Sequence, residues 1–299
     1  MHELDRIRLA LDDAAGRGEG AVVATVVSVD GSAYRGAGAR MVVRADGSTT
    51  GAVSGGCLEA DIVARAAGVL ASGTPEMVHY DTRASDAGVF GLGMGCQGVV
   101  DVRLEPLTGD ALRAEIGRLA ELRARNAVRL LVCGAGADAI PVVRFAAHTG
   151  WLVTVVDHRP SFATTERFPD AERVIHLDPS PSDGALASVV RLEALAAAVV
   201  MGHAAAHDRA RLHELLGVRS LRYLGVLGPR RRTLEMLEGA PGVAPGVLPP
   251  HLYAPIGFDI GAETPEEIAL AIVSECAAAL AGRTARSLRD VAGPIHSRG

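Results

Sequence analysis

The stretch from 127 to 157 constrains the fold of this chain more than any other. The apolar run Ala127–Cys133 predicts a buried strand, Gly134–Ala139 predicts a tight turn, and residues 140–149 have the apolar spacing of a helix. A second apolar run, 151–156, ends at Asp157, 23 positions after the first glycine of the turn. This is the pattern of a βαβ unit whose G-x-G-x-x-A turn is typical of Rossmann-like dinucleotide-binding folds.

The residues that follow continue to alternate between strand and helix patterns. Such alternation predicts a parallel sheet with helices on both faces. We expect strands at 173–176, 197–201 and 221–226, and helices near 183–194, at 205–216 and over 263–282, the last with Thr264 as its N-cap and Pro265 in its first turn.

The first 108 residues have a different pattern, in which short strands and two helices are mixed. Strands are expected over 21–29, 40–44, 76–81 and 99–104, and helices over 4–15 and 57–71. The predicted fold class is therefore α/β, with an N-terminal α/β domain over 1–108, a connector helix over 109–126, a Rossmann-like doubly wound parallel sheet over 127–283 and a tail over 284–299.

Two cysteines framed by glycines are the candidate site of the first domain. In Ser54-Gly55-Gly56-Cys57 the thiol is expected in the first turn of the helix 57–71, where the positive end of the helix dipole favours a thiolate and can also hold a phosphate. Cys96 lies in the loop 91–98, which has glycine at four of its positions. The remaining two, Cys133 and Cys276, lie in apolar runs and are expected to be inert core residues.

Composition and charge exclude several classes of protein. A net charge of -5 gives no basis for binding nucleic acid through a basic surface. The first residues lack the apolar run of a signal peptide, and no run reaches the ~18 apolar residues that span a bilayer. Four dispersed cysteines do not make a disulfide framework, and no C-x-x-C spacing indicates zinc. We expect a cytoplasmic protein with small-molecule or protein partners and no membrane partner.

Ligands of a doubly wound sheet gather at the carboxyl ends of its strands. Gly134, Gly136 and Asp157 are the dinucleotide fingerprint, although the neighbours His158 and Arg159 leave open whether a ribose, a phosphate or nothing is bound. His203 follows a predicted strand and is either an acid/base group or a packed cap. Arg230, Arg231 and Arg232 follow another strand, in a first turn where cations oppose the helix dipole. An anionic ligand would remove that conflict, and a solvated cluster is the alternative.

Taken together, these segments resemble the XdhC/CoxI family, accessory factors of xanthine dehydrogenase and related molybdenum hydroxylases. The resemblance covers about 25–280 in order. Its motifs are Gly38-Ala-Arg-Met41, Ser54-Gly-Gly-Cys-Leu-Glu59, the loop 91–98 with Gly95 and Cys96, Leu131–Gly136, Val200-Met-Gly-His203 with Asp208, Leu224–Gly228 with Arg230 to Arg232, and Pro255–Gly261 with Glu263–Ile268. Gln97 departs from a frequent glycine of the family, and Ala37 from a frequent proline.

The resemblance implies a chaperone that holds molybdopterin while a cysteine-desulfurase-type protein supplies its terminal sulfido ligand, and then inserts it into an apo molybdenum hydroxylase of the xanthine dehydrogenase type. Cys57 and Cys96 are the expected contacts to molybdenum or its sulfido group, and Arg40 or the arginines at 230–232 would engage the phosphate. Ser54, Gly55, Gly56 and Glu59 would frame that site. The apolar helix 264–281 favours a homodimer.

Two alternatives belong to other classes. One is a nicotinamide- or flavin-dependent oxidoreductase that binds NAD(P) or FAD in the second domain and uses His203 as its acid/base group. The other is a scaffold that only docks the hydroxylase onto its sulfur donor.

Overall fold

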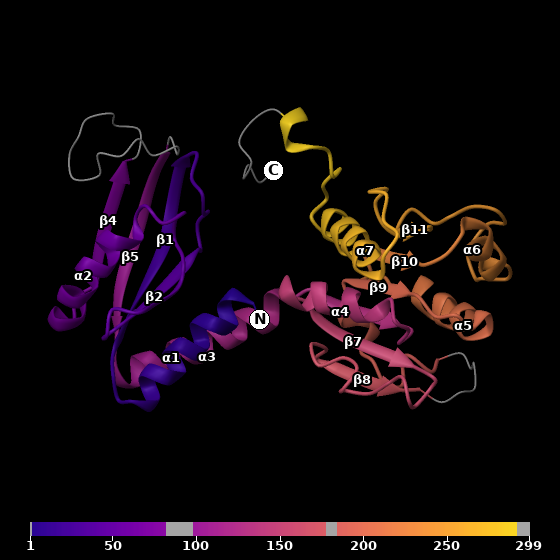
Figure 1. Ribbon diagram of the computed structural model, residues 1–299, viewed down its shortest axis with the longest axis horizontal. Helices are drawn as coiled ribbons and strands as arrows, with labels where there is room; N and C mark the ends of the chain where they lie inside the picture. Colours follow the sequence, from indigo (N-terminus) through magenta and orange to yellow (C-terminus); the bar gives the residue numbers. More distant parts are fainter. Residues whose placement is uncertain (1, 82–97, 178–183, 292–299) are drawn as a thin grey trace. The chain divides into compact units, whose positions relative to one another are not determined.

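The computed structural model describes residues 2–81, 98–177 and 184–291. The chain forms two compact units, one built on His2–Asn126 and the other on Ala127–Arg286 (Figure 1). Each unit has its own sheet and its own core. None of the helices in the described ranges is long and apolar enough to cross a membrane.

The first unit is built on a five-stranded antiparallel sheet with the order β3-β2-β1-β5-β4. Its central strand, β1, pairs with β2 on one side and with β5 on the other, with a bulge between Val26 and Ser28. The strands are β1 (Ala21–Gly31), β2 (Arg40–Arg44), β3 (Thr49–Gly51), β4 (Glu76–Asp81) and β5 (Gly98–Leu107), and the helices are α1 (Glu3–Gly16), α2 (Glu59–Ser72) and α3 (Gly109–Asn126).

The side chains of β1 alternate between the two faces of this sheet. Helices cover both faces, so both sets of side chains are buried. Val22, Ala24 and Val26 pack with the apolar side of α2. Ala21 and Val23 pack on the opposite face, in a second core that α1 and α3 complete. The segment expected as a connector, α3, is thus part of the packing of this unit.

The second unit contains six parallel strands in the order β11-β10-β9-β6-β7-β8. Read from the other edge, this is the doubly wound order in which the chain starts at the centre and reverses direction once. The strands are β6 (Arg129–Cys133), β7 (Leu152–Asp157), β8 (Arg173–His176), β9 (Ala197–Val200), β10 (Tyr223–Val226) and β11 (Leu252–Tyr253). The predicted fold class is confirmed.

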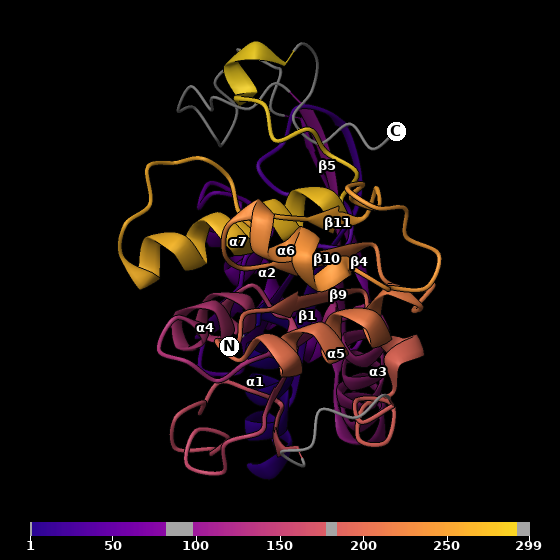
Figure 2. The ribbon, with the colours of Figure 1, turned by 90° about the vertical axis from the view of Figure 1, so that its right-hand side faces the viewer.

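Helices cover both faces of the parallel sheet, and Figure 2 shows α4, α5, α6 and α7 around its strands. Residues of α4 (Ala139–His148) and α7 (Pro265–Leu280) pack with one set of strand side chains, and those of α5 (Ala205–Leu216) and α6 (Arg230–Leu237) pack with the other. Thr264 caps α7 as predicted, in a capping box with Glu267.

The prediction of a helix near 183–194 is wrong. The described part of this segment forms successive turns from Gly184 and one short 3₁₀ helix, Leu192–Ala194. Gly184 has a φ of 82°, which is outside the helical region, and the backbone N–H of Leu186 bonds to the Glu214 carboxylate of α5 at 2.9 Å. Leu186, Val190 and Leu195 still pack into the core, so their apolar spacing reflects burial rather than a helix.

The start of α2 also differs from the prediction. Cys57 lies in a turn two residues before the helix, not in its first turn. The cause is Gly56, whose φ of 113° belongs to the left-handed side of conformational space and ends any helical path through it.

Candidate functional site

The loop between β3 and α2 is held together by the carboxylate of Glu59. One of its oxygens accepts hydrogen bonds from the backbone N–H of Ser54 at 2.7 Å and of Val53 at 3.2 Å. The other accepts from the Ser54 hydroxyl and from the N–H of Leu58. Burial raises the pKa of Glu59, but these hydrogen bonds, led by that from the Ser54 hydroxyl, outweigh it and hold the pKa below its usual range.

This network takes the place predicted for an external phosphate. Ser54 is buried, and its hydroxyl oxygen accepts from the N–H groups of Gly56 and Leu58, each at 3.1 Å. The N–H groups of Gly56 and Leu58, at the entrance of α2, are therefore satisfied by Ser54 and Glu59, within the chain itself.

Cys57 is exposed on this braced loop. Its Sγ lies 3.5 Å from the Ser54 hydroxyl oxygen. The ring of Tyr34 lies so near Gly55 that a side chain there would meet it at 3.5 Å, whereas a side chain at Gly56 would meet nothing. The thiol thus stands on a rigid backbone with open space beside it, as a soft donor for a metal or a sulfur group requires.

Arg40 lies on the other face of the sheet from α2. It shares its face with Val42, which packs with α1 and α3, whereas Met41 packs on the α2 side. Its Nε and Nη1 atoms are buried without a hydrogen-bond partner among the described residues, and burial lowers its pKa. The structure does not bring Arg40 and Cys57 to the same face. Gly95 and Cys96 lie outside the described residues.

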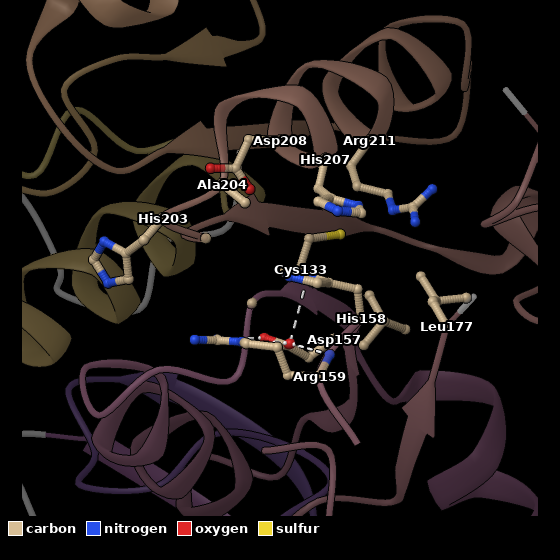
Figure 3. Close-up of a pocket in the computed structure, with 13 residues that line it drawn as sticks. Cys133, Asp157, His158, Arg159, Leu177, His203, Ala204, His207, Asp208 and Arg211 are labelled. Carbon is tan, nitrogen blue, oxygen red and sulfur yellow. Dashed lines mark hydrogen bonds and ion pairs between the residues drawn. The ribbon is translucent and has the colours of Figure 1, made fainter. Parts of the chain in front are cut away.

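The candidate site of the second unit is a pocket of about 230 Å³ at the carboxyl ends of β6, β7 and β9 (Figure 3). Here the strand order reverses, which is where doubly wound folds bind ligands. Gly134 has a φ of 120°, and a Cβ on it would lie 2.7 Å from the backbone nitrogen of Gly202. Only glycine allows the ends of β6 and β9 to approach so closely. A side chain at Gly136 would instead meet His203 at 3.6 Å.

Asp157, the acidic residue of the predicted dinucleotide fingerprint, is buried and bonded within the protein. It accepts from the N–H of Ala135 at 2.7 Å and from the guanidinium of Arg159 through both oxygens, at 2.8 and 2.9 Å. Burial raises the pKa of this carboxyl, but the bonds from Arg159 and the backbone outweigh it and lower the pKa to about 2. Asp157 is therefore an anion that fixes the glycine-rich turn.

Three histidines and one thiol also line the pocket. The rings of His158 and His207 stack at 3.9 Å between centroids, so they join the end of β7 to α5. Burial and the proximity of His158 lower the pKa of His207, and its Nδ1 is buried without a hydrogen-bond partner among the described residues. Cys133 points its sulfur into the same space, but burial raises the pKa of this thiol, as expected for an inert cysteine (Figure 3).

The arginines at the start of α6 have separate environments. Arg232 forms an ion pair with Asp208, and it donates to the carbonyl oxygens of Leu227 at 3.1 Å and Gly202 at 3.4 Å. The anion expected from outside the chain is thus supplied to Arg232 by α5. Arg231 is exposed beside Glu235, and Arg230 is exposed.

The first turn of α4 is satisfied within the chain. Asp138 makes no side-chain capping bond, but the N–H groups of Ala139 and Ile140 donate to the carbonyl oxygens of Gly136 and Ala137, each at 3.2 Å, and Pro141 has no N–H. Among the residues described, no group of three or more histidine, cysteine, aspartate or glutamate side chains is arranged to hold a metal ion.

Comparison with known proteins gives the same division of the chain. Residues 14–81 match the family model described as XdhC and CoxI family, and 130–276 match the XdhC Rossmann domain. A relative from Bacillus subtilis (strain 168), named as a probable xanthine dehydrogenase subunit, is 31% identical over 86% of this chain and 92% of its own length.

Two further similarities come from a sequence that matches half of this chain and from a solved structure. The molybdenum cofactor insertion chaperone PaoD of Escherichia coli (strain K12) is 29% identical over 50% of this chain and 56% of its own length. A crystal structure from Bacillus halodurans, described as a xanthine dehydrogenase, superposes with a TM-score of 0.79 at 29% identity and covers 96% of this chain and 98% of its own. With this agreement across both units, the chain belongs to the XdhC/CoxI family.

Proposed function

We propose that this protein is an accessory factor that binds the molybdenum cofactor and inserts it into a hydroxylase of the xanthine dehydrogenase type. The observation that carries the proposal is the exposed thiol of Cys57 on the loop that Ser54 and Glu59 brace. One relative is named a molybdenum cofactor insertion chaperone, and another carries the name of a xanthine dehydrogenase component. Family membership and an available soft donor support the same role.

Cys57 is the residue that would hold the cofactor, because a thiolate is a suitable ligand for a soft metal centre. The molybdenum group, when bound, supplies the redox centre of the hydroxylase that receives it. The chain itself supplies a fixed thiol, and Gly56, where a side chain would meet nothing, lets a bulky group approach the backbone. Ser54 orients the thiol through the contact at 3.5 Å.

The proposal includes the expected partners. A cysteine-desulfurase-type protein would add the sulfido ligand while the cofactor is held here, and the apo hydroxylase would then receive it. We also propose that the protein acts in the cytoplasm as a homodimer. Sedimentation of the purified chain tests the dimer, and pull-down with the apo hydroxylase and the sulfur donor tests the partners.

The decisive experiment is co-purification from cells fed with molybdate, with the bound material identified by mass spectrometry. The wild-type protein is expected to retain a molybdopterin, and Cys57→Ser to lose at least tenfold of it. Cys276→Ala is the matched control, since Cys276 is buried in α7. Full retention by Cys57→Ser would remove this residue from the site. Stoichiometric NAD(P) or flavin with no pterin would favour an oxidoreductase, and an empty protein that still binds the hydroxylase would favour a scaffold.

A further inference from the structure

The end of β7 differs in one respect from the usual binding site for a ribose in this fold. An acidic residue there normally accepts hydrogen bonds from the ribose hydroxyls of NAD. Asp157 has the right position, but both of its oxygens are taken by Arg159, and one also by the N–H of Ala135. A ribose diol would have to displace a bidentate ion pair to reach this carboxylate.

Two arginines lie beside the same turn. The guanidinium groups of Arg159 and Arg167 lie over the ring of Phe162, at 3.9 and 4.8 Å from its centroid. Arg167 also donates to the carbonyl oxygen of Ala135 at 3.3 Å, which places it against the glycine-rich turn. Asp157 neutralises one of these two cations.

The second cation has no such partner. Within the described ranges, no carboxylate forms an ion pair with Arg167, and its buried Nε makes no hydrogen bond. Asp170, an acid that follows closely in sequence, lies 4.0 Å from a different arginine, Arg144. A partly desolvated guanidinium without an anion is unfavourable, and a phosphate supplies both the charge and the acceptors that it lacks.

We propose that the second unit binds a nucleotide with a phosphate on its ribose 2′ position, of the NADP type, and discriminates against NAD. The 2′-phosphate lies at Arg159 and Arg167, at the end of β7. Gly136, where a side chain would meet only His203 at 3.6 Å, lets the rest of the nucleotide approach the backbone of the glycine-rich turn. This site is separate from Cys57 in composition and in ligand.

Arg159 has a double effect in this arrangement, and this gives the proposal its sharpest test. It contributes to phosphate binding, and it also occupies the carboxylate that would otherwise recognise a ribose diol. Replacing it should therefore weaken binding of 2′-phosphorylated nucleotides and, at the same time, free Asp157 for the hydroxyls of NAD. A residue with a merely structural role would change both affinities in the same direction.

The test is isothermal titration of the full-length protein with NADP⁺, NAD⁺, 2′,5′-ADP and 5′-AMP. The wild type is expected to bind NADP⁺ and 2′,5′-ADP at least tenfold more tightly than NAD⁺ and 5′-AMP. Arg159→Gln should lose at least tenfold for NADP⁺ and gain for NAD⁺, and Arg167→Gln should lose affinity for the 2′-phosphorylated ligands alone. Arg144→Gln is the control, because this arginine is exposed on α4 and already has the carboxylate of Asp170 at 4.0 Å.

Three results would overturn the proposal. They are equal affinity of the wild type for NADP⁺ and NAD⁺, no binding of either nucleotide at millimolar concentration, and a parallel loss of both affinities in the folded variants. The fluorescence of Trp151, the single tryptophan, verifies that each variant has folded. None of these results affects the retention of cofactor by Cys57, so the two proposals fail independently.

Discussion

Replacing Glu59 by glutamine tests whether the loop that carries Cys57 is braced by this carboxylate. The two carboxylate oxygens accept four hydrogen bonds, from the N–H groups of Val53, Ser54 and Leu58 and from the Ser54 hydroxyl. Glutamine keeps one of the two acceptor oxygens. Its NH₂ group replaces the other oxygen and cannot accept the hydrogen bonds that this oxygen receives. The Leu58 N–H keeps the Ser54 oxygen as an acceptor, so the main loss is the bond from the hydroxyl to a charged group.

Hydrogen bonds to charged groups contribute about 1.5–3 kcal/mol, and the half-buried position of Glu59 places the loss near the lower end, at about 2 kcal/mol. Hydrogen–deuterium exchange of peptides from 49–72 measures it locally. Opening of the loop should become about 30-fold more frequent, with matching loss of protection.

Glu121→Gln, an exposed change in α3, is the control, and peptides of α5 are the internal reference. Unchanged protection of 49–72 in Glu59→Gln would refute the reasoning.

Two other predictions concern the second unit, and Trp151 fluorescence during denaturant unfolding measures both. Gly134→Ala should lower the free energy of unfolding by about 3 kcal/mol, because the new side chain combines a φ of 120° with a contact of 2.7 Å to the backbone. Gly136→Ala, whose nearest new contact is at 3.6 Å, should change the free energy of unfolding by no more than about 1 kcal/mol. Equal losses for the two variants would contradict the close approach of β6 and β9. The lowered pKa of Asp157, about 2, means that its contribution of about 2 kcal/mol is fully present above about pH 4 and is lost as the pH falls toward the folded-state pKa. Asp157→Asn should therefore be less stable near neutral pH and lose less stability between about pH 4 and 2, and an unchanged acid limb would rule out this residue as its source.

The sequence predicted most of the fold because local patterns and burial agreed there. The βαβ unit, the strand 173–176 and the helix 205–216 match β8, α5 and their neighbours closely. The prediction failed at 183–194, where Leu186 and Val190 have helical spacing but reach the core from successive turns. Periodicity reports which residues are buried, and Gly184 and the bond from Leu186 to Glu214 decide how the backbone reaches the core.

The candidate site was harder to predict because its partners are distant in sequence. The motif around Cys57 was visible, but the role of Glu59 as the anion of its own helix depends on a side chain folding back over the loop. Asp208 meets Arg232 from 24 positions away, so the conflict with the helix dipole that indicated an external anion is resolved inside the chain. The sequence analysis did not identify Arg167 and Phe162. The signal was present, because Arg159 and Arg167 flank this aromatic residue in the segment after β7, and such a pair of arginines can indicate a phosphate site.

These cases share one physical reason, which also indicates where ligands belong in this molecule. A charge at a helix end predicts that some counter-charge is present, but it does not say whether the chain or a ligand supplies it. At α2 and α6 the chain supplies it, through Glu59 and Asp208. The stronger indication of a ligand is a group that the folded chain leaves without a partner among the described residues. By that criterion the Nε of Arg167 favours an anion beside the glycine-rich turn, and the Nε and Nη1 of Arg40 favour one in the first unit. The exposed Cys57 thiol, held on a braced loop, favours a soft metal centre for a different reason, which is its availability.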